Sequence, residues 1–403
     1  MAAFGAIPFQ PVGRDEAVFI LELRRPFLAA MQLVTAHETQ PLGFYAAAWL
    51  WPHDSLLLSR VLSWLPAVAV APVTWLLAGR LGVPQLPAGL FAASSPFLAW
   101  WAADSRMYTW LALFGGVVLL TAMSVVTARG AVALGVLIGL GLELHYFALP
   151  AGVAALAVLA LRGRLRMAGF ATAVAAVAAL PAAVALLAER SLLSTGYAWQ
   201  PVLTPYVALR DAGSLFAGSE DFLPALVAGP LLALLAIVGL ADRRAWPAAA
   251  FSVVTLGPAL AVSLFAQVFT PRYGAPAEPA LFLLMAAGAA RLPAVVTRTS
   301  IAIALALVVT GIFRFEIQRP PVQAWVGKRV AVVLDSHFAP NVAYYYASRR
   351  VDGFERPRVD RVGLWALPAA TSGAGDVFVG YCDEMPGSGR LTRYPGNECV
   401  ART

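Results

Sequence analysis

Long apolar segments separated by short polar loops fill most of the chain after residue 56. A helix needs about 20 mostly apolar residues to cross the hydrocarbon core of a bilayer. The stretch 131–161, at roughly 31 residues, is too long for one straight span and is divided into two. Glu143, His145 and Pro150 interrupt it near its middle. The pattern therefore predicts ten spans, at 59–79, 86–103, 107–127, 131–145, 146–161, 167–188, 223–241, 246–266, 275–291 and 299–314.

Arginine residues gather in alternate loops of this array. Loops with an excess of Lys and Arg lie on the cytoplasmic side of bacterial membranes, which orients the predicted bundle. A single span over 131–161 would move the 162–166 cluster to the opposite side, so sidedness supports two helices there. The loop arginines are Arg80, Arg129, Arg162, Arg164, Arg166, Arg243, Arg244, Arg291 and Arg298.

The regions before and after the spans have a different character. Residues 1–56 are predicted to be an extracytoplasmic first loop, with short apolar stretches at 26–34 and 42–51 that are helices lying along the interface or ordinary packed loop helices. The tail, 315–403, has strand-like runs at 329–335 and 376–381 and a helical stretch at 340–348. The fold class is therefore an all-α polytopic membrane bundle over 57–314, followed by a small extracytoplasmic α/β domain. Cys382 and Cys399 lie in this tail, where a disulfide between them is plausible if it is extracytoplasmic.

Composition agrees with an integral membrane protein. The chain has 403 residues, of which 60% are hydrophobic and 13% charged, and its mean hydropathy is +0.73. Soluble proteins carry about 25% charged residues. The net charge of +7 comes from loop arginines and does not indicate a nucleic-acid partner. No glycine-rich phosphate loop, CxxC pair or HExxH motif is present.

Polar residues of the predicted extracytoplasmic face form an ordered set of motifs. Arg14-Asp15-Glu16 comes first, and His37-Glu38-Thr39-Gln40-Pro41-Leu42-Gly43-Phe44-Tyr45 follows it. Ala103-Asp104-Ser105-Arg106-Met107-Tyr108, the turn His145-Tyr146-Phe147-Ala148, and Pro271-Arg272-Tyr273 complete the series. Ionised side chains are costly near lipid unless they have a partner or a function, so this convergence suggests chemistry at the membrane surface.

These motifs, in this order, resemble those of the GT-C superfamily of polytopic glycosyltransferases. The branch they look most like contains the protein O-mannosyltransferases and the bacterial aminoarabinose transferases. The resemblance covers about residues 14–314. It implies a sugar transferase that uses a polyprenyl-phosphate donor on the extracytoplasmic face of the plasma (inner) membrane. The acceptor would be a lipid, a glycan or a protein.

The resemblance also implies roles for individual residues. Asp15 would be the general base, with Glu16 as a supporting acid. Arg272, Tyr273 and Arg106 would hold the donor phosphate. The residues expected to line the sugar and acceptor pocket are His37, Gln40, Asp104, Tyr108, His145 and Tyr146.

The family places a transmembrane helix ahead of its acidic motif, whereas no span precedes Asp15 in this sequence. A misassigned start codon, a truncation or loss of the helix would each explain this difference.

Each candidate residue also has a structural explanation. Asp104 and Arg106 could pair with each other, Arg272 could snorkel at a helix end, and His145 could be a satisfied interfacial histidine. No obligate metal is expected because no spacing encodes a metal site, although Asp15, Glu16, His37, Asp104 and His145 could in principle supply ligands to a divalent ion.

The alternative functions are a lipid-linked-sugar flippase or transporter, and a non-catalytic scaffold. Transporters tend to place polar sites near the bilayer midplane, whereas these lie at span ends, which favours surface chemistry.

Overall fold

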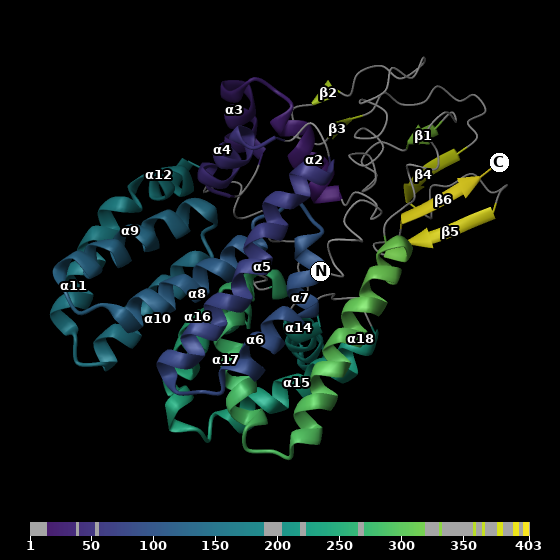
Figure 1. The fold of residues 1–403 in the computed structure, drawn as a ribbon. Helices are drawn as coiled ribbons and strands as arrows, with labels where there is room; N and C mark the ends of the chain where they lie inside the picture. The colour runs from purple at the N-terminus through teal and green to yellow at the C-terminus, as the bar shows by residue number, and fades with distance from the viewer. Residues whose placement is uncertain are drawn as a thin grey trace.

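The computed structural model describes residues 14–37, 40–52, 56–188, 204–217, 223–264 and 270–318 together with six short strands of the tail. The helical part is a bundle, with three short helices gathered at one end of it (Figure 1). These three are α2 (Arg14–Leu23), α3 (Phe27–His37) and α4 (Leu42–Leu50). The stretches predicted as short helices at 26–34 and 42–51 are thus helical.

The first half of the bundle follows most of the predicted boundaries. The helices are α5 (Leu56–Leu81), α6 (Gln85–Ala93), α7 (Pro96–Ala102), α8 (Tyr108–Ser124), α9 (Ala128–Leu144), α10 (Ala148–Leu161), α11 (Leu165–Ala178) and α12 (Leu180–Ala188). The division of 131–161 into two helices is confirmed, because α9 and α10 are separated by the turn that contains His145. Gly163, with φ of +78°, ends the turn region after α10, a conformation that glycine adopts without strain.

The second half contains α14 (Pro205–Ala217), α15 (Leu223–Gly239), α16 (Trp246–Ser263), α17 (Glu278–Ala289) and α18 (Ala294–Gln318). Two 3-10 segments, η1 (Arg243–Ala245) and η2 (Pro271–Ala277), precede α16 and α17. Every residue of α17 is buried, so this helix is at the centre of the bundle. A helix that is apolar all round is expected in such a position.

Three predicted spans are less regular than expected. The span 86–103 is broken between α6 and α7, because Ser95 caps α7 by accepting a hydrogen bond from the backbone N–H of Leu98 and Pro96 occupies its first turn. The span 167–188 is bent by 53° between α11 and α12. The beginning of the span 275–291 belongs to the proline-containing segment η2.

Two of the described helical segments are long and apolar enough to cross a membrane. They are Leu56–Leu81 and Arg243–Ser263. The bent pair α11 and α12 would make a third if it is one span. Several other helices are apolar but shorter. The number of spans therefore stays a prediction.

The described strands of the tail form two small sheets. β1 (Val330–Val332) pairs in parallel with β4 (Val377–Tyr381), and β6 (Glu398–Arg402) joins β4 antiparallel with Gly380 opposite Cys399. β5 (Arg390–Tyr394) completes the order β1-β4-β6-β5. β2 (Arg358–Val359) and β3 (Trp365–Ala366) pair separately. β1 and β4 fall within the predicted strands, but the predicted helix at 340–348 and Cys382 lie outside the described residues, so the α/β domain and its disulfide remain predictions.

The polar end of the bundle depends on close backbone packing between α8 and η2. A Cβ atom at Gly115 in α8 would overlap the carbonyl oxygen of Pro276 in η2. Only glycine permits this approach. The contact holds η2, which carries Arg272 and Tyr273, against the helix that begins with Tyr108.

Candidate active site

A buried ion pair joins the N-terminal helix to the bundle. Glu16 of α2 and Arg60 of α5 are both fully buried. The Arg60 Nε donates to Glu16 Oε1 and the Arg60 Nη2 to Glu16 Oε2, each over 2.7 Å. This bidentate geometry is the strongest form of the guanidinium–carboxylate interaction. Two charges can be kept away from water here because each satisfies the other.

The loop between α7 and α8 is tied to the same carboxylate. Ser105 donates to Glu16 Oε1 from its hydroxyl, over 2.9 Å, and from its backbone N–H, over 3.2 Å. Ser63 of α5 donates to the carbonyl oxygen of Arg106 over 2.8 Å. Glu16 therefore joins three segments that are far apart in sequence. The side chain of Asp15, the predicted base beside it, lies outside the described residues.

Asp104 and Arg106 are both buried in this loop. The Arg106 backbone N–H donates to the Asp104 carbonyl oxygen over 2.7 Å, closing a tight turn. The Arg106 Nη1 donates to the hydroxyl of Tyr45 over 3.3 Å. The second and third motifs of the sequence thus meet through Tyr45, which packs on Phe19 of α2.

Arg272 lies among aromatic rings. Its guanidinium carbon is 5.6 Å from the ring centroid of Tyr108 and 5.7 Å from that of Tyr273. Tyr273 in turn stacks on Phe147, with centroids 4.2 Å apart, and lies 5.2 Å from the His145 ring. Such contacts orient a guanidinium without consuming its N–H donors. The predicted residues Tyr108, His145, Arg272 and Tyr273 are brought together in one cluster.

The state of His145 follows from its contacts. Its Nδ1 accepts a hydrogen bond from the backbone N–H of Phe147 over 3.1 Å, so a neutral ring carries its proton on Nε2. Burial, and then the positive charges of Arg106 and Arg272, lower the pKa of His145 to about 3. The imidazole is therefore neutral at pH 7. Within the described residues, its Nε2 has no hydrogen-bond partner.

Together these groups make a cationic, donor-rich cluster, consisting of Arg106, Arg272, His145, Tyr108 and Tyr273. Both guanidiniums are close enough to His145 for their positive charges to lower its pKa. Two guanidiniums and an imidazole N–H suit an oxyanion such as phosphate, whose oxygens accept several charge-assisted hydrogen bonds. The described part of the chain holds no group of three or more His, Cys, Asp or Glu placed to bind a metal ion.

Other predicted residues are not linked to this cluster by the described contacts. Gln40 is buried just before α4, and Tyr146 is half-buried in the turn after α9. His37 is the last residue of α3, and its side chain lies outside the described residues. Their roles in a sugar or acceptor pocket stay predictions.

Sequence reasoning missed several buried charged residues, among them Arg60 and Glu278. Arg60 lies near the start of a predicted span, and an arginine in an apolar helix requires a partner, so the acidic pair could have been matched to it. Glu278 begins α17 and is 1% exposed. Neither of its carboxyl oxygens has a hydrogen-bond partner within the described residues. The signal for Glu278 was an acid within an otherwise apolar predicted span.

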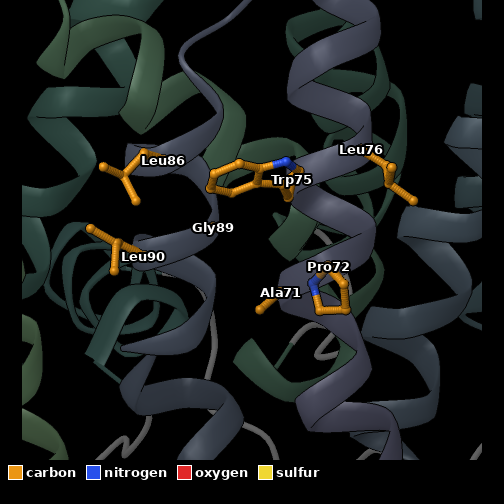
Figure 2. Close-up of a pocket in the computed structure, with 7 residues that line it drawn as sticks. All are labelled: Ala71, Pro72, Trp75, Leu76, Leu86, Gly89 and Leu90. Carbon is orange, nitrogen blue, oxygen red and sulfur yellow. The ribbon is translucent and has the colours of Figure 1, made fainter.

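Two apolar grooves lie away from the cationic cluster. One is about 500 Å³ and runs between α5 and α6, where the Trp75 ring extends from α5 toward Leu86 and Gly89 of α6 (Figure 2). Its residue Pro72 lies twelve positions beyond Arg60, or about 18 Å along the α5 axis at 1.5 Å per residue. The other is about 470 Å³. It is lined by residues from the end of α10, from the first turns of α16, and by Leu240 in the turn after α15. Neither groove belongs to the candidate active site.

Comparison with solved structures identifies the fold. No protein-family model matches the sequence, and no curated protein sequence matches it. The apo structure of ArnT from Cupriavidus metallidurans aligns with a TM-score of 0.53 and 17% identity over 86% of this chain. ArnT bound to undecaprenyl phosphate aligns with a TM-score of 0.51 and 15% identity, again over 86% of this chain, and over 72% of its own. This chain spans 66% of the length of apo ArnT. The bundle thus has the fold of ArnT, and with its apolar helices this fold indicates an integral membrane protein.

Proposed function

We propose that this protein is a membrane glycosyltransferase of the GT-C type. It transfers a sugar from a polyprenyl-phosphate donor to an acceptor on the extracytoplasmic face of the plasma membrane. The observation that carries this proposal is the cluster in which Arg272 lies over the rings of Tyr108 and Tyr273 beside His145, within an ArnT-like bundle. A solved ArnT structure contains undecaprenyl phosphate, which supports the same class of lipid donor here.

The reaction requires charge stabilisation at the leaving group. As the acceptor oxygen bonds to the anomeric carbon, the bond from that carbon to the phosphate oxygen breaks and its electron pair leaves with the phosphate. Arg272 and Arg106 stabilise the negative charge that grows there. The Arg272 guanidinium lies over the rings of Tyr108 and Tyr273, which help to hold it in place. The His145 Nε2–H adds a neutral donor to the same oxygens.

The acceptor must lose a proton in the same displacement. Asp15 is the proposed base, and one base is sufficient for an inverting single displacement. Glu16 follows it in α2 and is held by Arg60 and Ser105. Glu16 is therefore proposed to position the start of α2, the helix that carries Asp15.

A transfer assay tests this function directly. Purified protein is reconstituted with a radiolabelled polyprenyl-phosphate sugar and membrane acceptors. We expect Arg272→Ala and Asp15→Asn each to reduce transfer by about 10²-fold or more, because each removes a group needed in the transition state. Arg129→Gln, an exposed arginine at the opposite end of the bundle, is the matched control and retains activity.

Two outcomes would contradict the proposal. Transfer that survives both substitutions would remove the assigned site. Movement of the labelled lipid across the bilayer without covalent transfer would show a flippase instead.

A further inference from the structure

The second apolar groove is separate from the candidate active site and differs from the first groove in its lining. This groove, here called the α10–α16 groove, is about 470 Å³ and lies where α10 ends and α16 begins. Its size is within the range of about 300–1,000 Å³ typical of sites for small organic ligands. Val158 and Leu161 line it from α10, Leu240 from the turn after α15, and Trp246 and Ala250 from α16.

The walls of this groove are apolar and open to the surroundings. Leu161 is 77% exposed, Trp246 57% and Leu240 45%. The Trp246 indole N–H donates to the Leu240 carbonyl oxygen over 3.0 Å, which fixes the ring as one wall. Tryptophan is enriched at the membrane–water interface, where its ring sits at the level of the lipid headgroups. The groove thus presents a hydrocarbon-binding surface beside an interfacial anchor.

One side chain that lines the groove, Arg162, is positively charged. Arg162, the residue after α10, lines it and is exposed. Its Nη1 contacts the Met123 sulfur over 3.5 Å, and a thioether is a weak acceptor. Most of the five guanidinium N–H donors are therefore left for another group.

No carboxylate of the described residues neutralises Arg162. Asp242, the acid of the loop before α16, is engaged instead by Arg244, which donates to it from Nη2 over 2.7 Å and from Nε over 3.0 Å. Arg243 is exposed beside this pair. The groove therefore combines an apolar channel with uncompensated positive charge at its end.

We propose that the α10–α16 groove binds an anionic phospholipid, with an acyl chain in the groove and the phosphate at Arg162. The groove between α5 and α6 in Figure 2 serves as a comparison within the same protein. It has a similar volume, but all of its lining residues are apolar. Charge complementarity selects the occupant at Arg162, whereas nothing in the lining of the α5–α6 groove selects one headgroup over another. This lipid site is distinct from the proposed active site and does not depend on the proposed function.

Native mass spectrometry of the full chain in detergent tests this site. The probes are phosphatidylglycerol and phosphatidylcholine with identical acyl chains, added in competition. We expect the wild type to retain phosphatidylglycerol about tenfold better, because a phosphate of net negative charge makes charge-assisted hydrogen bonds to a guanidinium. Arg162→Gln should abolish this preference, and Arg162→Lys should restore part of it. Arg129→Gln, an exposed arginine outside the groove, should leave it unchanged.

The acyl-chain contact has its own test. Ala250→Phe fills the groove without changing charge, and it should reduce retention of phosphatidylglycerol severalfold. It also keeps the proposal testable if Arg162→Gln fails to fold. Equal retention of the two lipids by the wild type, or equal effects of Arg162→Gln and Arg129→Gln, would overturn the proposal. Full displacement of the lipid by glycerol phosphate would overturn the acyl-chain part, since it would show a site for the headgroup alone.

Discussion

Two arginine–carboxylate pairs lie near opposite ends of α5 and have opposite surroundings. Glu16 and Arg60 meet beside the first turn of the helix, and both side chains are 0% exposed. Asp242 and Arg244 meet beyond its last turn, where the Arg244 Nη1 also donates to the Gly82 carbonyl oxygen. The Arg244 side chain is 59% exposed and that of Asp242 is 7% exposed, so this pair, called the exposed pair below, has its cation in solvent and its carboxylate buried.

The two pairs therefore differ in how strongly the stability of the protein depends on keeping both partners. A buried ion pair contributes little net stability compared with an apolar replacement, but the loss of one partner leaves a charge stranded away from water. An exposed pair is screened by solvent and its loss is tolerated. The buried pair therefore fixes α2 and the Ser105 loop in place at the candidate active site, whereas the exposed pair leaves the arginine-bearing end open to other anions.

The largest effect is expected from breaking the buried pair. Arg60→Met should lower the free energy of unfolding by about 3–5 kcal/mol, because Glu16 would remain buried without its cation. Thermal unfolding in detergent measures this loss. The double variant Glu16→Gln with Arg60→Met should be less destabilised than Arg60→Met alone, since no charge is then stranded. If the double and single variants were equally unstable, the pair would not be energetically coupled.

A slightly smaller effect is expected at the α8–η2 contact. Gly115→Ala would place a methyl group against the Pro276 carbonyl oxygen, and overpacking of this kind costs about 1–3 kcal/mol. Because η2 carries Arg272, sugar transfer should also fall. Gly169→Ala in α11 is the control, since an added Cβ there meets no neighbouring side chain or packed segment within 4 Å and no proline follows it. It should be neutral or slightly stabilising by the helix propensity of alanine.

Acid should destabilise the protein through His145. The pKa of the folded state, about 3, lies below the ordinary value of 6.5, so the unfolded chain binds more protons at intermediate pH. The stability contributed by the neutral imidazole is complete above pH 6.5 and is lost as the pH falls from 6.5 toward 3. At pH 5 the loss is about 2 kcal/mol, at about 1.36 kcal/mol per pH unit. Unfolding of wild type and His145→Gln between pH 7.5 and 5 checks this; an equal dependence on pH in both would assign the effect to another group.

The smallest effect is expected at the exposed pair. Asp242→Asn should shift the midpoint of thermal unfolding only slightly, because solvent screens the Arg244 charge. The pKa of Asp242 is held below its ordinary value chiefly by its hydrogen bond from Arg244, so the small stabilisation is present above the ordinary pKa and is lost as acid protonates the carboxylate. A shift as large as that of Arg60→Met would contradict the contrast between the two ends. The variant should also leave the phosphatidylglycerol preference at Arg162 intact.

The helical class, most helix positions and the grouping of several polar motifs could be predicted from the sequence alone. Apolar runs are local, and the requirement to satisfy backbone groups within lipid leaves helices as their solution. The boundary between α9 and α10 was predictable because length and charge both required it. The break between α6 and α7 depended on Ser95 and Pro96, whose local capping signal is weaker than the surrounding hydrophobicity.

Only the tertiary structure decided which charges meet. Arg60 could have been recognised as an arginine in need of a partner, but its pairing with Glu16 spans 44 positions of the chain. Likewise, the neutral state of His145 depends on burial and on Arg106 and Arg272, which come from different segments. A one-dimensional pattern indicates that a buried charge needs compensation. Which residue supplies it is determined by how the helices pack, because ion pairing and burial depend on distances between side chains remote in sequence.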